Sequence, residues 1–276
     1  MPDCVHCRRR LINIITMEII LFFVALFASI IGAICGIGGG VIIKPVLDAF
    51  GWMSVSSASF LSGCTVLSMT AYAVLRERRS NCVALQAKKL IPISIGAAIG
   101  GIAGKALFQW MLRGDSGSEA GIVQAVCLIV LVVGTIVYTL VEHRIHTFHL
   151  QSVFIRWLVG VSLGTLSAFL GIGGGPFNLV ALSFFFSLRD KEAVVSSLFI
   201  ILISQISSLL MQFATRTVPD VSWTMLVAMI CGGIFGGMIG RMSCNHLSVK
   251  NGKTIFISLN LIIIGISCWN IYRFLI

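Results

Sequence analysis

The sequence predicts an all-α polytopic membrane protein of about eight transmembrane segments, arranged as two homologous four-segment repeats with glycine-broken helices. The chain of 276 residues is 57% hydrophobic and only 11% charged, a balance that soluble domains rarely approach. Apolar runs long enough to cross a bilayer recur along it. Two glycine-rich motifs also occur in the same order in both halves of the chain.

Uninterrupted apolar runs supply most of the expected segments. A helix needs about 20 residues to cross the hydrocarbon core at about 1.5 Å per residue. The runs cover residues 14–35, 53–75, 90–112, 122–141, 193–214, 222–243 and 254–275. The first run resembles a secretory signal, but it is too long and no small-residue cleavage site follows it. We therefore expect it to remain as a span.

Glycine motifs divide the chain into two related halves. The motif GIGGG stands at 36–40 and again at 171–175. A second pair, GAAIGGIAGK at 96–105 and GGIFGGMIGR at 232–241, follows in the same order and at nearly the same spacing. We therefore predict a tandem duplication. Its parts are a first membrane repeat at 1–140, a polar linker at 141–153 and a second membrane repeat at 154–276.

Each GIGGG motif is expected to break a helix inside the membrane. Consecutive glycines destabilise a helix, and unwound backbone survives in a bilayer only when it is buried in protein or lines a wet cavity. The helix that restarts after the break directs unpaired N–H groups and a positive dipole end at that cavity, which attracts anions. Such breaks at matching positions of two repeats are typical of substrate sites in secondary transporters. The predicted substrate-binding glycines are Gly36, Gly38, Gly39, Gly40, Gly171, Gly173, Gly174 and Gly175.

Polar side chains near the breaks extend this predicted site. Ser62 and Ser197 occupy matching positions in the segments after the breaks, and Asn178 lies in the first turn of the second restart. Lys44 follows the first break by one turn. Either it adds its charge to the cavity or it extends outward to the interface. Further polar residues that either line the path or bond within their own helices are Thr65, Ser68, Ser204 and Gln205.

Lys105 and Arg241 end the second pair of glycine motifs at equivalent positions. Paired cations related by the duplication suit an anion path, so both belong to the predicted site. The competing interpretation is that each long side chain reaches the membrane interface from the last third of its segment. The four-residue glycine spacing before them predicts close helix packing where the two repeats touch.

The sequence allows two topologies. If the GIGGG segments cross the membrane as broken helices, each repeat has an even number of crossings and the repeats are parallel. If they re-enter as hairpins, the number is odd and the repeats are inverted. The distribution of Lys and Arg between the two sides does not separate these arrangements. Of the two, we expect the crossing arrangement.

Other classes of function find little support in the sequence. The net charge of +10 arises mostly from short clusters between apolar runs, which orient membrane segments, so nucleic acid is not an expected partner. We expect no histidine or carboxylate deep in a span, since Glu18 and Asp48 lie near segment ends. The protein is therefore not expected to be an enzyme, and a proton relay through carboxylates is not predicted.

Two groups of possible metal ligands carry weak signals. Cys4 and Cys7 form half of a zinc motif without a second half downstream. The other group, His143, His146 and His149, lies in the polar linker, where solvated histidines are common. We therefore predict neither a metal nor a cofactor.

The glycine motifs resemble those of the TauE/SafE sulfite exporter-like permeases, also called the TSUP family. The stretch GIGGGVIIKPVL resembles the family's G-x-G-G-G followed by P-x-L, and GIGGGPFNLVAL resembles it with the proline moved forward. Ala58 with Ser62, and Ala193 with Ser197, resemble its A-x-x-x-[ST] element. The resemblance covers nearly the whole chain, although Lys44 departs from the apolar residue usual at that position.

This resemblance implies a permease of the bacterial cytoplasmic membrane for small sulfur-containing or organic anions, of the sulfite, sulfonate or thiosulfate class. The alternatives are a channel-like anion uniporter and, less favoured, an intramembrane enzyme. The expected partners are the anionic substrate and the lipid bilayer, with a homo-oligomer as an option. The resemblance does not name the anion, the direction or the coupling ion.

Overall fold

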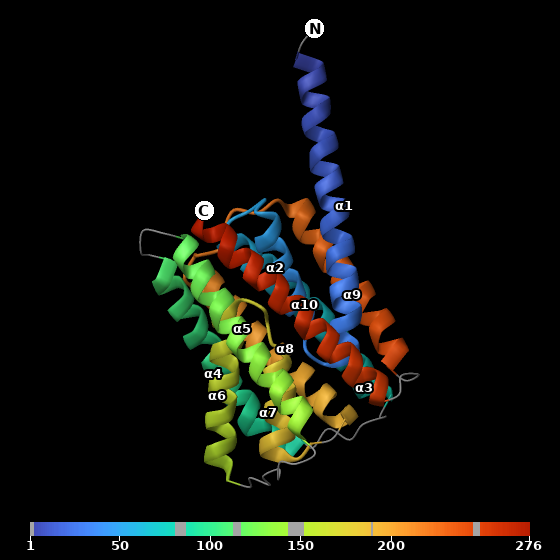
Figure 1. Ribbon diagram of the computed structural model, residues 1–276, viewed down its shortest axis with the longest axis vertical. Coiled ribbons are helices and arrows are strands. Elements are labelled where there is room, and N and C mark those ends of the chain that lie inside the picture. Colours follow the sequence, from blue (N-terminus) through green and yellow to red (C-terminus); the bar gives the residue numbers. More distant parts are fainter. Residues whose placement is uncertain (1–2, 81–86, 113–116, 143–151, 189, 245–248) are drawn as a thin grey trace.

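The computed structural model describes residues 3–80, 87–112, 117–142, 152–188, 190–244 and 249–276, which form helices joined by short connections (Figure 1). The helices are α1 (Asp3–Cys35), α2 (Gly40–Phe50), α3 (Val55–Ser80), α4 (Ala87–Leu112), α5 (Gly117–Val141), α6 (Val153–Leu170), α7 (Pro176–Phe186), α8 (Asp190–Ala214), α9 (Trp223–Cys244) and α10 (Val249–Leu275). The described residues contain no strand.

Eight of these helices, all except α2 and α7, are long and apolar enough to cross a membrane. The eighth is α6, which covers the short apolar stretch before the second glycine motif. These findings confirm the predicted all-α polytopic membrane fold. Most of the predicted polar linker lies outside the described residues.

Both GIGGG motifs lie at a break between a long helix and a short one, and only Gly40 of the ten residues is helical. α1 ends at Cys35 and α2 begins at Gly40, while α6 ends at Leu170 and α7 begins at Pro176. Gly174 has a φ of 141°, a conformation that L side chains rarely adopt, so this turn requires glycine. Pro176 suits the first helical position because an N–H there has no intrahelical acceptor.

The short helix α2 returns alongside α1 instead of continuing across the bundle. Gly39, just before its start, packs against the backbone of Ser29 in α1. Leu47, near its end, clusters with Leu21, which precedes Ser29 by two turns of α1. α2 has 11 residues, a length of about 16 Å, which is half of the hydrocarbon core. Figure 1 shows α1 descending and α2 rising beside it, so the first break is the tip of a re-entrant hairpin.

The second short helix makes the same turn from the opposite side. Leu182 and Phe186 of α7 cluster with Leu90 and Ile93 near the start of α4. Gly160, in the first half of α6, packs on the carbonyl of the same Ile93. The end of α7 therefore lies at the same depth in the bundle as the first half of α6, and the second break is also the tip of a hairpin.

Because each hairpin returns to the side from which it entered, it adds no net crossing, and the net crossings come from α3, α4 and α5 in one half and α8, α9 and α10 in the other. An odd number of crossings per half places the two halves in inverted orientation. Our expectation that the broken helices cross the membrane was wrong. The physical reason is that each short helix buries its apolar side chains against the side of the bundle from which its hairpin entered.

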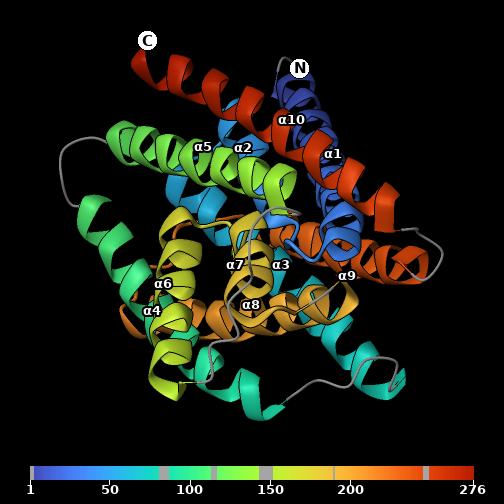
Figure 2. The same cartoon turned by 60° about the horizontal axis from the view of Figure 1, so that its bottom comes forward.

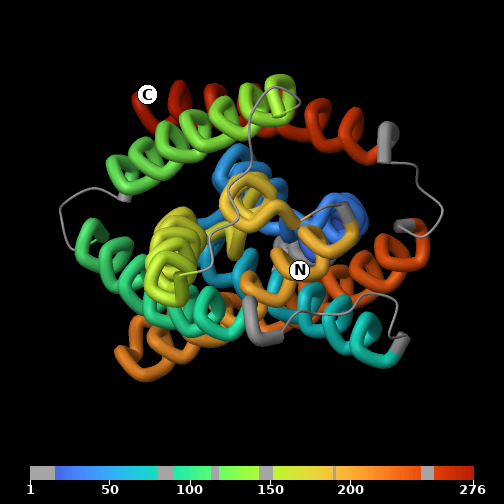
Figure 3. Tube along the Cα trace, turned by 90° about the horizontal axis from the view of Figure 1, so that it is seen from below, coloured from blue at the N-terminus to red at the C-terminus, as the bar shows by residue number. Residues whose placement is uncertain are grey.

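Both short helices lie in the middle of the protein. α2 packs between α10 and α3, and α7 packs in the same way between α5 and α8. Figures 2 and 3 show α5 and α10 as one outer layer, α3, α4, α8 and α9 as the other, and the short helices between them. The long helices of the two hairpins, α1 and α6, also have corresponding neighbours, because α1 packs on α9 and α6 packs on α4.

Glycine stripes bring the two halves into backbone contact. A Cβ added at Gly100 of α4 would lie 2.2 Å from the carbonyl oxygen of Val161 in α6. One added at Gly236 of α9 would lie 2.4 Å from that of Leu26 in α1. No side chain fits at such distances, so this approach requires glycine. The prediction that these glycines pack one half against the other is confirmed.

Candidate functional site

The two glycine breaks touch each other inside the bundle. A Cβ added at Gly40 would lie 2.0 Å from the carbonyl oxygen of Ile172, so the two segments are in backbone contact. Both motifs, 36–40 and 171–175, are buried throughout. The predicted glycines of the two halves therefore come together in one place.

The crossing helices α3 and α8 flank this contact. The Cβ position of Gly38 lies 3.6 Å from Val66 of α3 and 3.5 Å from Ile201 of α8. Ser62 precedes Val66 by one helical turn, and Ser197 precedes Ile201 by one turn. Residues four apart share a helix face, so both serines lie on the faces turned toward the breaks.

The predicted polar side chains are buried here without a hydrogen-bond partner. Ser62 and Ser197 are 0% exposed and Asn178 is 1% exposed. Neither serine hydroxyl, nor either end of the Asn178 amide, has a partner among the described residues. Its amide nitrogen lies 3.3 Å from the Cβ position of Gly174 in the second break. An unsatisfied buried polar group costs about 1–3 kcal/mol, and such costs are retained at functional sites.

The breaks also present backbone donors. In the described part of the chain, the amides of Gly38, Gly39, Gly173 and Gly174 have no backbone acceptor. α2 and α7 begin directly after these segments, so the positive ends of both helix dipoles lie at the contact. Unpaired N–H groups at helix N-termini are the arrangement that binds anions.

Lys44 is buried and forms an ion pair within α2. Its side chain is 4% exposed, and its Nζ lies 2.6 Å from Oδ2 of Asp48, one turn later. The second carboxylate oxygen of Asp48 is buried without a partner in the described residues. The interpretation in which Lys44 extends outward is therefore wrong. The sequence-based expectation for Asp48 missed its burial, because α2 turns back into the bundle.

Lys105 reaches the second break from α4. Its Nζ donates a hydrogen bond of 3.2 Å to the Ser59 hydroxyl and lies 4.7 Å from the centre of the Phe108 ring. A Cβ added at Gly171 would lie 2.1 Å from Oγ of Ser59 and 3.3 Å from Cε of Lys44, so both lysines meet at this corner. We call Lys44, Asp48, Ser59 and Lys105 the lysine corner. Because Lys105 is 2% exposed, the interpretation in which it reaches the interface is wrong.

Arg241 lies elsewhere, although the sequence places it at the position equivalent to Lys105. Its guanidinium forms an ion pair with Glu77 near the end of α3, and both side chains are largely buried. Both cations contact α3, but Lys105 meets Ser59 near the start of that helix and Arg241 meets Glu77 near its end. The structure does not bring them together, and the charge of Arg241 is balanced locally.

The lysine corner has no counterpart at the first break. In the alignment of the two halves, Lys44 and Ser59 correspond to Leu179 and Val194. A Cβ added at Gly36 would lie 2.8 Å from Val194, where the equivalent position at Gly171 meets Ser59. The positive charge of the site is therefore concentrated at the second break.

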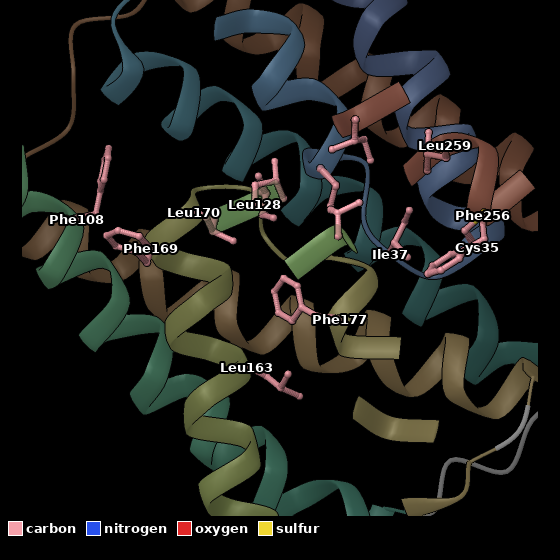
Figure 4. Close-up of a cluster of buried hydrophobic side chains, with 14 of the residues drawn as sticks. Cys35, Ile37, Phe108, Leu128, Leu163, Phe169, Leu170, Phe177, Phe256 and Leu259 are labelled. Carbon is pink, nitrogen blue, oxygen red and sulfur yellow. The ribbon is translucent and has the colours of Figure 1, made fainter. Parts of the chain in front are cut away.

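Apolar side chains enclose the breaks on the side of α5 and α10. Leu128 of α5 and Leu259 of α10 belong to one buried cluster with Ile37 of the first break and with Leu170 and Phe177, which flank the second (Figure 4). Such a lining lowers the local dielectric, so each charge at the breaks acts more strongly than it would in water.

Sequence reasoning missed Asp48 and Ser59 as members of the site. Asp48 had a usable signal, because it follows Lys44 by four residues, the spacing of a helical ion pair. Ser59 had none, since its contact with Lys105 joins residues 46 apart in the chain.

The remaining candidates are less informative. Thr65 and Ser68 donate to carbonyl oxygens of their own helix, which agrees with the interpretation that they bond within their helices. The described residues include no group of three or more His, Cys, Asp or Glu that could hold a metal ion. The side chains of Cys4, Cys7, His143, His146 and His149 lie outside the described part.

Two hairpins whose buried glycine tips meet among polar groups resemble the discontinuous helices that form substrate sites in many membrane transporters. The chain belongs to the TauE/SafE sulfite exporter family, because the family model "Sulfite exporter TauE/SafE" matches residues 21–267. This match confirms the resemblance seen in the glycine motifs. The protein is thus a multi-pass membrane protein of that family.

One curated relative is the "Probable membrane transporter protein YunE" of Bacillus subtilis (strain 168), which is 29% identical over 119 residues. The alignment covers 42% of this chain and 41% of the relative, so less than half of either protein is matched. No solved structure matches the chain.

Proposed function

We propose that this protein carries small sulfur-containing or organic anions, of the sulfite, sulfonate or thiosulfate class, across a bacterial cytoplasmic membrane. The substrate binds where the two glycine breaks meet. One observation carries this proposal: the buried polar side chains of Ser62, Ser197 and Asn178, which have no partner among the described residues, gather at that contact beside glycine amides that have no described backbone acceptor. Oxyanions accept several hydrogen bonds at once, and hydrogen bonds to charged acceptors are the stronger ones.

Charge and family membership support an anionic substrate. Lys44 and Lys105 bring positive charge to the second break, and the dipoles of α2 and α7 add to it. The family name supports the sulfur oxyanion class. The name of the relative supports transport without specifying a substrate.

The arrangement favours alternating access over an open channel. The glycine breaks and the side chains of Ser62, Asn178 and Ser197 are all buried, so the described residues close the site to solvent in this conformation. The hairpins enter from opposite sides, so each one closes the route from its own side. Sliding of one half past the other along the glycine stripes would open these routes in turn.

Removing the unpartnered polar groups tests the site. We expect Ser62→Ala combined with Asn178→Leu to lower the rate of sulfite uptake into liposomes by about tenfold or more, because charge-assisted hydrogen bonds contribute about 1.5–3 kcal/mol each. The same variant should unfold at an equal or higher temperature, since groups that the fold leaves unsatisfied are gone. Both quantities are measured on the same purified protein.

The matched control is Ser162→Ala in α6, whose hydroxyl already bonds to the Leu158 carbonyl at an exposed position. It should change neither quantity. Normal uptake by the Ser62→Ala and Asn178→Leu variant would contradict the proposed site. Direct substitution of Gly174 is a poorer test, because a side chain there would meet Ile201 at 2.4 Å and disturb the fold.

A further inference from the structure

The lysine corner carries an unbalanced charge. Lys44, Lys105 and Asp48 have exposed fractions of only 3%, 2% and 8%. Asp48 balances Lys44 at 2.6 Å. Lys105 contacts the Ser59 hydroxyl and the Phe108 ring, which carry no formal charge, and it forms no ion pair with a described carboxylate. The formal charges of the corner therefore leave one excess positive charge.

We infer that the site selects singly charged anions over dianions. This inference rests on the proposed function and specifies the charge of its substrate. An isolated ammonium is unfavourable in a low-dielectric interior, and one bound negative charge cancels it. A dianion would instead leave an excess negative charge and would place it near the Asp48 carboxylate.

Asp48 is the residue that sets this limit. By pairing with Lys44 it withholds the second cation from the substrate. Arg273 of α10 donates to the backbone carbonyls of Asp48 and Ala49, and its side chain is exposed, so water screens its charge. Glu18 of α1 is half-buried and accepts a hydrogen bond from Thr224. Neither of these outer charges changes the balance inside the corner.

A comparison of two anions of fixed charge tests the inference. Purified protein in liposomes is supplied with methanesulfonate, a monoanion, or thiosulfate, a dianion, and initial uptake rates are measured. The unsubstituted protein should prefer methanesulfonate. Asp48→Asn adds a second excess positive charge and should shift the rate ratio toward thiosulfate by roughly tenfold or more. Adding Lys44→Met to Asp48→Asn returns the excess to one charge and should restore the original ratio.

The possible outcomes distinguish failure of the charge-selectivity inference from failure of the proposed function. Preference of the unsubstituted protein for thiosulfate, or an unchanged ratio in Asp48→Asn, would overturn the inference. Uptake of neither anion would count against the proposed function instead. If Asp48→Asn does not fold, competition in the unsubstituted protein decides. Thiosulfate should then inhibit methanesulfonate uptake roughly tenfold less strongly than ethanesulfonate does, and equal inhibition would overturn the inference.

Discussion

Replacing Lys105 by methionine should abolish anion transport, with a fall in initial uptake rate of about a hundredfold or more. The variant leaves the bound anion buried without the Lys105 ammonium as its counter-ion, and removing one partner of a buried charge pair costs about 3–5 kcal/mol. Methionine keeps the apolar stem that packs in α4 but loses the ammonium. The lysine corner would then hold only the balanced pair of Lys44 and Asp48. The measurement is methanesulfonate uptake into liposomes, together with the unfolding temperature of the purified variant.

Two control variants accompany this test. Lys105→Arg keeps the positive charge and should retain most of the flux. Lys253→Met removes a lysine whose side chain is 40% exposed and paired with Glu142. Exposed pairs contribute about 0–1 kcal/mol, so neither uptake nor stability should change appreciably. Full uptake by a folded Lys105→Met variant would contradict a role for this ammonium in anion binding.

Replacing Arg241 alone by methionine should lower the free energy of unfolding by about 3–5 kcal/mol, because it breaks a buried ion pair by removing one of the two charges. The two side chains are 9% and 7% exposed, so water screens the lost interaction little. Adding Glu77→Met to the same chain should recover most of the stability, since an apolar pair can replace a buried ion pair. Thermal unfolding in detergent measures both variants.

The double variant also distinguishes a structural role of Arg241 from a role in anion transport. Arg241 lies on the contact of α9 with α3 and its charge is balanced there. The double variant should therefore transport anions at nearly the normal rate. A double variant as unstable as Arg241→Met would show that the buried charge is not the cause of the loss.

The transmembrane segments were predictable because length and apolar composition alone decide whether a helix can cross a bilayer. The glycine motifs were predictable for a similar reason, since consecutive glycines are poor helix formers wherever they occur. Ser62, Ser197 and Asn178 followed from their positions near the breaks, and the structure places all three at buried positions where they have no partner in the described part of the chain.

The hairpin topology was not predictable from composition. The positions of Lys and Arg fit both arrangements, and the choice depends on where Leu47 and Leu182 bury their side chains. These contacts join each short helix to residues far along the chain or on the preceding helix. A local pattern does not contain that information.

The different environments of Lys105 and Arg241 show a second limit of prediction from the sequence. Equivalent positions in the predicted duplication suggested equivalent roles. Their neighbours have diverged, however, so Lys105 faces Ser59 while Arg241 faces Glu77. The role of each cation is set by these partners, which lie 46 and 164 residues away in the chain.

A cysteine placed at the contact of the two breaks tests the central claim most directly. Ser62→Cys is introduced into a chain whose native cysteines have been replaced, and it is labelled with 2-sulfonatoethyl methanethiosulfonate, itself a small sulfonate. Ser94→Cys, at a buried position in α4 away from the contact, is the control. Our account predicts that methanesulfonate slows labelling of Ser62→Cys alone, with half-protection at the concentration that half-saturates transport. Equal labelling rates with and without saturating anion, in a variant that still transports, would contradict it.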